Sequence, residues 1–236
     1  MKADAIIVSA GQGLRFMAGR KKQFFSLGGK PLLAHTLAPF EASPLVRGIY
    51  LVVGGEDIEY CQKEIVEPYH YTKIAKILPG GPERQDSVRN GLEALPPDAD
   101  LVVIHDGVRP FVSREMIEES IRSAIRFGAA IVAIPVKDTI KMVHPEGTVL
   151  KTLEREFLYQ AQTPQTFRTD LIKEAYQKAK EEGYTGTDDA SLVERFGKKV
   201  YLLPGSYTNI KITTLEDLLL AELLLQRKDL PGGEMG

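Results

Sequence analysis

Short apolar runs alternate with amphipathic segments along most of the chain. The apolar runs are rich in β-branched residues and predict strands at residues 4–9, 48–54, 73–78, 100–105, 129–135 and 199–203. The amphipathic segments predict helices at residues 31–42, 56–67, 84–95 and 114–127. Strands that alternate with helices of this length form right-handed βαβ crossovers. We therefore expect an α/β fold with a doubly wound, mostly parallel sheet covered by helices on both faces.

One region breaks this alternation. Between Pro135 and Gln162 the pattern predicts no helix, and residues 136–143 and 148–153 favour two extended stretches joined by a turn at 144–147. We expect a β-hairpin arm here. A hairpin cannot bury its own apolar residues, so it must pack on the domain or be covered by another subunit. A last helix is expected at 215–226, where core packing explains the leucines.

Composition limits the class of protein. The 236 residues fit one domain, with 43% hydrophobic and 26% charged residues, as in ordinary soluble proteins. A net charge of -2 gives no general attraction to nucleic acid or to an anionic membrane. Cys61 is the only cysteine, and the four histidines lack ligand spacing, which argues against a zinc site. No apolar run approaches the ~20 residues of a membrane span, and no signal peptide is evident, so we expect a cytoplasmic protein.

The first strand ends in a glycine-containing turn followed by cations. Gly11 and Gly13 come directly after the apolar run, and Arg15 and Lys22 follow them. Without a Cβ the backbone can approach a ligand closely, and successive N–H groups form an anion-binding concavity. The turn therefore indicates a polyphosphate site, with a plain tight turn as the alternative. It is not a dinucleotide fingerprint, because Phe16 stands where the third glycine belongs, and nothing in the chain fits a P-loop.

Two further loops follow predicted strands. After the third strand, Gly80 and Gly81 precede Asp86 and Ser87, which could bind the edge of a base. The alternative is a turn in which Glu83 and Asp86 are favoured by the dipole of the next helix.

After the fourth strand come Asp106, Gly107 and Arg109. A carboxylate at this position commonly binds Mg²⁺ or a ribose hydroxyl. The alternative is an Asp-Gly turn in which Arg109 pairs with Asp106. Further along, Thr187 and Asp188 form a natural N-cap for a helix.

Taken as a set, these motifs resemble the IspD cytidylyltransferase family. The matching segments follow the family's order and spacing, and the resemblance covers residues 4 to about 225. They are residues 9–23, 80–88, 106–110, 137–141, 163–165 and 209–211. The resemblance implies a Rossmann-like nucleotidyltransferase over residues 1–236 that transfers a cytidylyl group from CTP to 2-C-methyl-D-erythritol 4-phosphate, with Mg²⁺ as cofactor and pyrophosphate as product. It also implies a homodimer in which the arm at 136–157 clasps the other subunit.

The family's roles carry over to matching positions in this sequence. The implied catalytic cations are Arg15, Lys22 and Lys211. The implied nucleotide-binding residues are Ala10, Gly11, Gly13, Gly80, Gly81, Arg84, Ser87 and Asp106. The implied substrate-binding residues are Asp106, Arg109, Thr139 and Arg155, and Asp106 is the implied metal ligand. No general base is needed, because a phosphate monoester has a second pKa of ~6 and is mostly a dianion near neutral pH.

Two positions depart from the family pattern. Lys21 replaces the usual proline before Lys22 and could compete for the phosphates, and Ser9 replaces the commoner alanine. Three alternative functions stay open at this point: a ribitol-5-phosphate cytidylyltransferase, a sugar-phosphate nucleotidyltransferase that uses UTP or dTTP, and a nucleotide-binding regulator without catalysis.

Overall fold

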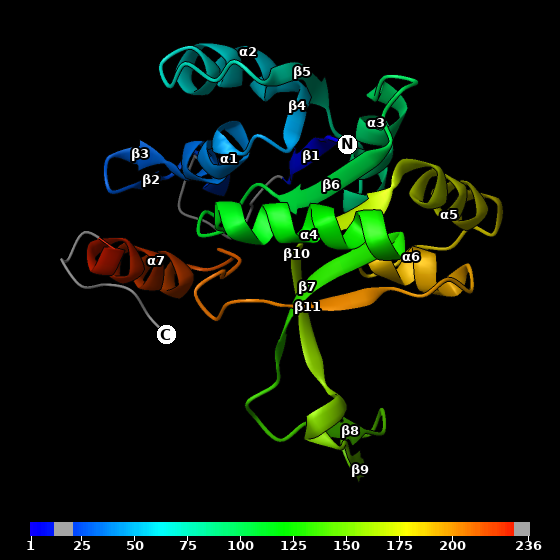
Figure 1. Cartoon of the computed structure of the whole chain (residues 1–236). Helices are drawn as coiled ribbons and strands as arrows, with labels where there is room; N and C mark the ends of the chain where they lie inside the picture. Colours follow the sequence, from blue (N-terminus) through cyan, green and yellow to red (C-terminus); the bar gives the residue numbers. More distant parts are fainter. Residues whose placement is uncertain (12–20, 229–236) are drawn as a thin grey trace.

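The computed structural model describes residues 1–11 and 21–228, with the side chains of 227 and 228 left out. Its centre is a seven-stranded sheet in the order β11-β7-β10-β6-β1-β4-β5 (Figure 1). In chain order these strands are β1 (Ala3–Ser9), β4 (Val46–Val53), β5 (Ile74–Pro79), β6 (Leu101–Asp106), β7 (Ala129–Pro135), β10 (Tyr159–Arg168) and β11 (Tyr201–Pro204). The six strands expected from the apolar runs are all present within two residues of their predicted bounds.

Strand β10 was not among the strands expected from the sequence. It runs antiparallel to both neighbours, β6 and β7, whereas the other pairings in this sheet are parallel. Its sequence carries Gln160, Gln162, Gln165 and Pro164 rather than an apolar run, and its pairing with β7 shifts register between Ala161 and Gln165. Polar side chains and a proline hide the usual strand pattern, so only the tertiary structure reveals this strand.

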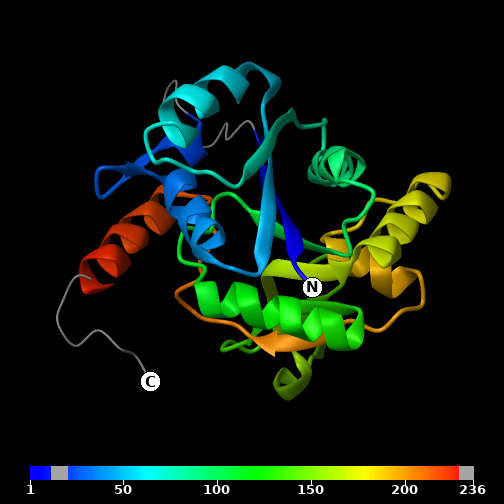
Figure 2. The same ribbon diagram turned by 45° about the horizontal axis from the view of Figure 1, so that its top comes forward.

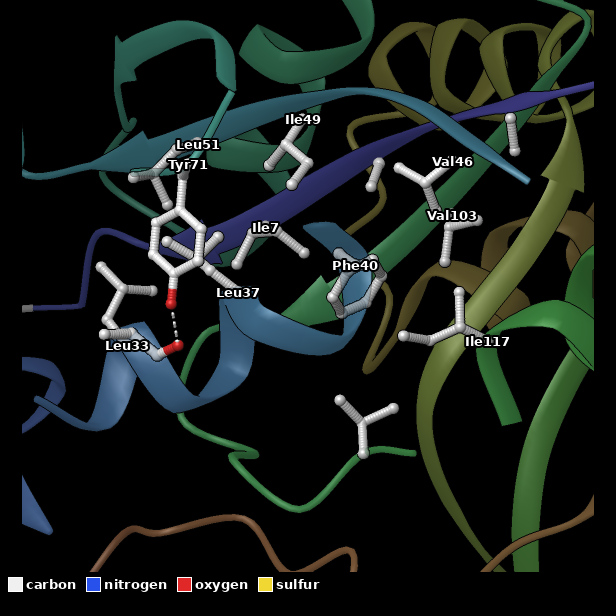
Figure 3. Packing of buried hydrophobic residues seen from close by; sticks show 14 of the residues in the cluster. Ile7, Leu33, Leu37, Phe40, Val46, Ile49, Leu51, Tyr71, Val103 and Ile117 are labelled. Carbon is white, nitrogen blue, oxygen red and sulfur yellow. Dashed lines mark hydrogen bonds between the residues drawn. The ribbon is translucent and has the colours of Figure 1, made fainter. Parts of the chain in front are cut away.

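Helices cover both faces of the sheet, as the sequence predicts. One face carries α1 (Leu32–Ala42), the π-helix η3 (Cys61–Val66) and α4 (Arg114–Phe127); the other carries α3 (Arg84–Ala94), α5 (Thr169–Glu181) and α6 (Asp189–Arg195) (Figures 1 and 2). Alternation along β1 divides the core, because Ile7 packs with α1 and α4 while Ile6 packs with α3 and α5. Figure 3 shows the first cluster, where Phe40 lies among residues of β1, β4 and α4.

Two helical regions differ from the expectation. The segment expected as a helix at 56–67 is helical without a break, but it is not one α-helix: η2 (Gly55–Asp57), α2 (Ile58–Tyr60) and the π-helix η3 follow one another directly. Helix α5 was not predicted, although its buried side chains Ile172, Ala175, Tyr176 and Ala179 have helical spacing. That spacing was a usable signal in the sequence.

The predicted hairpin arm is present. Strands β8 (Lys141–Val143) and β9 (Val149–Thr152) pair antiparallel and project away from the central sheet (Figure 1). Behind them lies the short 3-10 helix η4 (Arg155–Phe157). Several apolar side chains of this region are exposed, among them Val149 at 59% and Phe157 at 72%. The arm therefore presents apolar surface that the described part of this chain does not cover.

The last helix, α7 (Leu215–Lys228), packs beside a small hairpin of β2 (Ser26–Leu27) and β3 (Lys30–Pro31) (Figures 1 and 2). Leu27, Phe111, Ile212 and Ala221 form part of a third buried cluster there. Core packing accounts for only part of the leucines: Leu218, Leu224 and Leu225 pack partly buried against this cluster. Leu219, Leu220 and Leu223 are exposed at 64%, 45% and 59%, so the core-packing role expected for the leucines is wrong for these three. Across the described parts of the chain, no helix combines the length and the apolar character that crossing a membrane requires.

Candidate active site

A cavity of about 300 Å³ opens at the carboxyl ends of β1 and β6, the edge where ligands bind in open α/β sheets. It is lined by segments that the sequence analysis singled out separately, and they lie far apart in the chain. The lining residues are Val8, Ser9, Ala10, Gly11, Lys22, Gln23, Gly81, Pro82, Glu83, Arg84, Ser87, Asp106, Val108 and Lys211.

The turn after β1 forms one wall of the cavity. The buried side chain of Gln23 donates its amide N–H to the carbonyl oxygen of Ser9 at 3.0 Å, which ties the residue after Lys22 to the end of the strand. A Cβ built at Gly11 would meet no atom of the described residues within 4 Å. Packing among those residues therefore does not require glycine here, as expected where a ligand approaches the backbone closely.

The loop after β5 forms the opposite wall. A Cβ at Gly80 would lie 2.2 Å from the Cβ of Ala10, so this glycine lets the two walls touch. The N–H of Gly81 donates to the hydroxyl of Ser87 at 3.1 Å, and that hydroxyl donates to the carbonyl of Glu83 at 3.1 Å. These bonds fix a narrow, flat wall built largely from backbone.

The two interpretations of this loop concern different residues. Asp86 accepts a hydrogen bond from the backbone N–H of Glu83 at 3.3 Å and belongs to the capping box of α3. It has the helix-start role given as the alternative. Gly81 and Ser87 line the cavity, as expected of residues that surround a base.

Asp106, at the end of β6, lies among three cations. Its carboxylate is 3.1 Å from Nε of Arg84, 3.0 Å from Nζ of Lys211 and 3.6 Å from Nε of Arg109. Burial by itself would raise the pKa of Asp106, but the positive charges of Arg84, Lys211 and Arg109 outweigh it and hold the pKa well below its ordinary value. The carboxylate is therefore ionised throughout the neutral range.

Buried hydrogen bonds hold Asp106 from the side that faces the protein interior. The hydroxyl of Thr163 accepts from the Asp106 N–H at 3.1 Å and lies 2.9 Å from Nδ1 of His105. Nε2 of His105 faces the carbonyl oxygen of Arg109, which can only accept, so Nε2 carries the proton and the Thr163 hydroxyl donates to Nδ1. Burial lowers the pKa of His105 to about 4, and the ring is neutral at pH 7.

The two adjacent lysines at the start of η1 (Lys22–Phe24) have different surroundings. Lys22 lines the cavity, as expected. Lys21 does not reach the phosphate site: its ammonium lies 2.6 Å from Asp57 and also contacts Glu56. The expectation that Lys21 could compete for phosphates is not met in this structure, because two carboxylates of η2 already neutralise it. Gly13 and Arg15 lie outside the described residues.

The expected substrate-binding residues do not all meet at the cavity. Arg109 is buried and donates from Nη1 to the carbonyl of Asn209 at 2.8 Å, while its Nε lies near Asp106, so the pairing offered as the alternative is present. Thr139 and Arg155 lie on the exposed arm, where Arg155 donates to the carbonyl of Lys137 at 2.9 Å. Neither lines the cavity of this subunit.

Asp189 was missed as a residue connected to the site. It is fully buried at the first position of α6 and accepts from Nη2 of Arg84 at 2.8 Å. In the sequence it stands directly behind Asp188, which caps α6 through the N–H of Ser191 at 2.9 Å, as predicted. The cap explained both acidic residues equally well, so nothing in the pattern separated Asp189 from its neighbour.

The cavity suits a metal ion only when a ligand supplies most of the coordination. No group of three or more acidic, cysteine or histidine side chains in the described part of the chain could hold a metal. Mg²⁺, however, usually takes one or two carboxylates together with substrate phosphates. Asp106, ionised and at the cavity wall, fits that requirement.

A doubly wound sheet with a glycine turn, a flat backbone wall and a cluster of cations at its carboxyl edge defines a nucleotide-binding enzyme of the nucleotidyltransferase class. Comparison with known sequences makes the assignment specific. The family model described as IspD, 2-C-methyl-D-erythritol 4-phosphate cytidylyltransferase, matches residues 3–227, and the chain belongs to this family.

Individual relatives agree with the family model over nearly the whole length. A 2-C-methyl-D-erythritol 4-phosphate cytidylyltransferase of Syntrophus aciditrophicus (strain SB) is 49% identical over 228 residues, which cover 97% of each chain. Among solved structures, 4-diphosphocytidyl-2C-methyl-D-erythritol synthase from Anaerococcus prevotii DSM 20548 has a TM-score of 0.86 at 37% identity, covering 95% of this chain and 96% of that one. The cytidylyltransferase of Thermus thermophilus has a TM-score of 0.76 at 33% identity, covering 94% and 98%.

Proposed function

We propose that this protein transfers the cytidylyl group of CTP to 2-C-methyl-D-erythritol 4-phosphate and releases pyrophosphate. One observation carries the proposal: Lys22, Arg84 and Lys211 gather around the cavity at the ends of β1 and β6, beside the carboxylate of Asp106. Membership of the cytidylyltransferase family supplies the identity of the two substrates.

The reaction needs charge control rather than a proton acceptor. A phosphate oxygen of the polyol phosphate bonds to the α-phosphorus of CTP, the bond from that phosphorus to the oxygen bridging to the β-phosphate breaks, and pyrophosphate leaves with the electron pair. The attacking phosphate is already a dianion, since its second pKa is ~6. The protein must bring two anions together and neutralise the charge that builds up on the triphosphate, which cations at fixed positions do.

Three cations are proposed for this work. Lys22 contacts the triphosphate, Lys211 acts at the α-phosphate and the incoming substrate, and Arg15 joins them from the loop outside the described residues. The support for the first two is their place in the cavity wall. Asp106 limits this positive charge and would hold Mg²⁺, which when bound would neutralise phosphate oxygens of CTP.

The preference for a small base follows from the close approach of the two walls of the pocket. Ala10 and Gly80 lie in contact, and the backbone from Gly81 to Ser87 closes the pocket beside them. Cytosine has a single six-membered ring, whereas a purine has two fused rings. The smaller base therefore fits more easily against such a wall. We propose that this wall, together with the backbone of Gly11, favours the pyrimidine of CTP over a purine.

The arm is proposed to complete the site of a second subunit. Residues 136–157 carry Thr139 and Arg155, which do not reach this chain's own cavity, together with apolar side chains that the other described elements leave exposed. A homodimer would bury those side chains and bring Thr139 and Arg155 to the partner's polyol phosphate. We treat residues 1–236 as one nucleotidyltransferase domain with this arm, and its cytoplasmic location stays a prediction.

Pyrophosphate release tests the proposal directly. Purified protein with Mg²⁺ and CTP is supplied with 2-C-methyl-D-erythritol 4-phosphate or with ribitol 5-phosphate, and then CTP is replaced by UTP or dTTP. We expect rapid release only with CTP and the methylerythritol substrate. Preference for ribitol 5-phosphate would move the substrate assignment to the sister enzyme, and preference for UTP or dTTP would indicate a sugar-phosphate nucleotidyltransferase. Tight CTP binding without turnover of either polyol would favour a regulator.

A further inference from the structure

A chain of polar contacts leads from the cavity into the packed layer beneath it. Nε of Arg84 donates to Asp106 at 3.1 Å, and Nη2 of the same guanidinium donates to Asp189 at 2.8 Å. The other oxygen of Asp189 accepts from the hydroxyl of Tyr176 at 2.5 Å. Asp189 has no exposed surface and Tyr176 is 5% exposed, so the two residues of this series that lie farthest from the cavity are closed to solvent.

The elements that meet here come from three parts of the sequence. Arg84 begins α3, Tyr176 lies in the middle of α5, and Asp189 begins α6. Of the four side chains in this series, Arg84 and Asp106 line the cavity and the other two do not. Asp189 and Tyr176 therefore reach the site through Arg84.

A buried carboxylate is costly unless it is paired, so the arrangement around Asp189 must do something for the fold or for the site. As a helix-start residue Asp189 is not needed, because Asp188 and Ser191 already form the capping box of α6. Its oxygens instead point to Arg84 and Tyr176. With one oxygen taken by the Tyr176 hydroxyl, the other is left for a single guanidinium N–H, which sets the rotation of the Arg84 head group.

The geometry points to Asp189 and Tyr176 as positioning residues that orient the Arg84 guanidinium toward Asp106 and the nucleotide. A planar guanidinium held at both ends keeps its remaining N–H groups in one direction. When asparagine replaces Asp189, Arg84 keeps an ionic partner only at Asp106 and its bond to the amide oxygen is weaker than its bond to a carboxylate. The N–H groups of Arg84 that face the nucleotide are then less firmly preorganised. This inference adds two positioning residues to the proposed function, and its turnover assay rests on that function.

The test is a double-mutant cycle between Asp189 and Arg84. Asp189→Asn keeps the shape of the side chain but removes its charge and one acceptor. We expect it to lower kcat/KM for CTP by about tenfold, on the scale of losing one hydrogen bond to a charged group. In an Arg84→Met background the same change should lower kcat/KM by less than about twofold, because Asp189 acts only through Arg84.

Stability provides a second readout in the same set of proteins. Arg84→Met leaves the Asp189 carboxylate buried without its cation, so it should lower the midpoint of urea unfolding. Adding Asp189→Asn should restore part of that loss. If Arg84→Met does not fold, Arg84→Lys provides the background, since a single ammonium cannot span both carboxylates as the guanidinium does.

Matched variants separate positioning from simple damage. Ser191→Ala weakens the cap of α6 without touching Arg84 and should change kcat/KM by less than about twofold. Tyr176→Phe removes the hydroxyl that holds Asp189 and should give a smaller loss than Asp189→Asn in the same direction. Equal losses from Asp189→Asn in both Arg84 backgrounds, or a Ser191→Ala loss as large as that of Asp189→Asn, would overturn the inference.

Failure of the proposed function is recognised separately. If the wild-type protein releases no pyrophosphate from CTP with either polyol phosphate, the reaction assignment fails while the positioning claim stays testable. The same cycle is then run on CTP dissociation constants by calorimetry, with about tenfold and less than about twofold again the expected changes. A change in CTP affinity that is equal in both backgrounds would contradict the claim there too.

Discussion

Nζ of Lys21 lies 2.6 Å from the carboxylate of Asp57, whereas the next residue, Lys22, lines the active-site cavity. Two adjacent cations are thus assigned to different tasks by their surroundings. Burial lowers the pKa of Lys21, but its bonds to Asp57 and Glu56 more than offset this and raise it. Lys21 is tied to η2, while Lys22 lines the cavity in which the triphosphate is proposed to bind.

The first prediction compares these neighbours. Lys22→Ala should lower kcat by about 10²–10³-fold, because one cation that stabilises the transition state is lost. Lys21→Ala removes the same charge one position away and should cost less than about tenfold. Steady-state pyrophosphate release measures both. A small loss for Lys22→Ala, below about tenfold, or equal losses for the two variants, would mean that Lys22 is not at the reacting phosphate.

The second prediction concerns the contact between the two walls of the base pocket. Gly80→Ala places a Cβ 2.2 Å from the Cβ of Ala10 and 2.8 Å from Oγ of Ser87. The walls must separate, and we expect a loss of about 1–3 kcal/mol in unfolding free energy, as for other overpacked sites, with CTP binding weakened by about tenfold or more. Gly55→Ala is the control, because its Cβ would meet nothing closer than 3.9 Å among the described residues. Calorimetry with CTP and urea unfolding measure the two effects.

The third prediction is a pH dependence of stability that arises from His105. Burial lowers the pKa of His105 in the folded protein to about 4, whereas an exposed histidine titrates near 6.5. Between pH 7 and pH 5 the unfolded chain therefore binds a proton that the folded protein does not. The free energy of unfolding should fall by about 2 kcal/mol over this interval. Asp106, whose pKa is also lowered, adds to the loss only at more acidic pH.

Urea unfolding at a series of pH values tests this assignment. His105→Asn keeps a polar side chain facing Thr163 but cannot titrate, so its stability should change less between pH 7 and pH 5. A variant that loses as much stability as the wild type over this interval would assign the effect to other groups.

The fourth prediction concerns the arm. The backbone N–H of Leu153 donates to the carbonyl of Ile140 at 3.0 Å, so residues 141–152 can be replaced by Asn-Gly, a dipeptide that closes tight hairpins. The proposed homodimer predicts that light scattering reports a dimer for the full chain and a monomer for the shortened one. Turnover should also fall, because the proposal places Thr139 and Arg155 at the site of the partner. A shortened protein that stays dimeric and fully active would remove the arm from the mechanism.

Local patterns were sufficient for most of the sheet. Buried parallel strands read as continuous apolar runs, and amphipathic helices repeat their apolar positions with helical spacing, so both signals lie within a short window of sequence. The loops after β1, β5 and β6 carried their glycines and charges in the same readable way. Strand β10 escaped because its buried residues include Gln162, Thr163 and Gln165, whose partners lie in other segments.

Only the tertiary structure decides which charged residues pair with one another and which of them face the cavity. A lysine, an arginine or an aspartate looks the same in the sequence whether it pairs with a distant carboxylate or faces a cavity. The three-dimensional fold brought Lys211 and Arg84 to Asp106, paired Lys21 with Asp57, and buried Asp189 behind Arg84. Local propensity acts over neighbouring residues, whereas the energy of a charge depends on every group within several ångströms of it, and those neighbours exist only once the chain has folded.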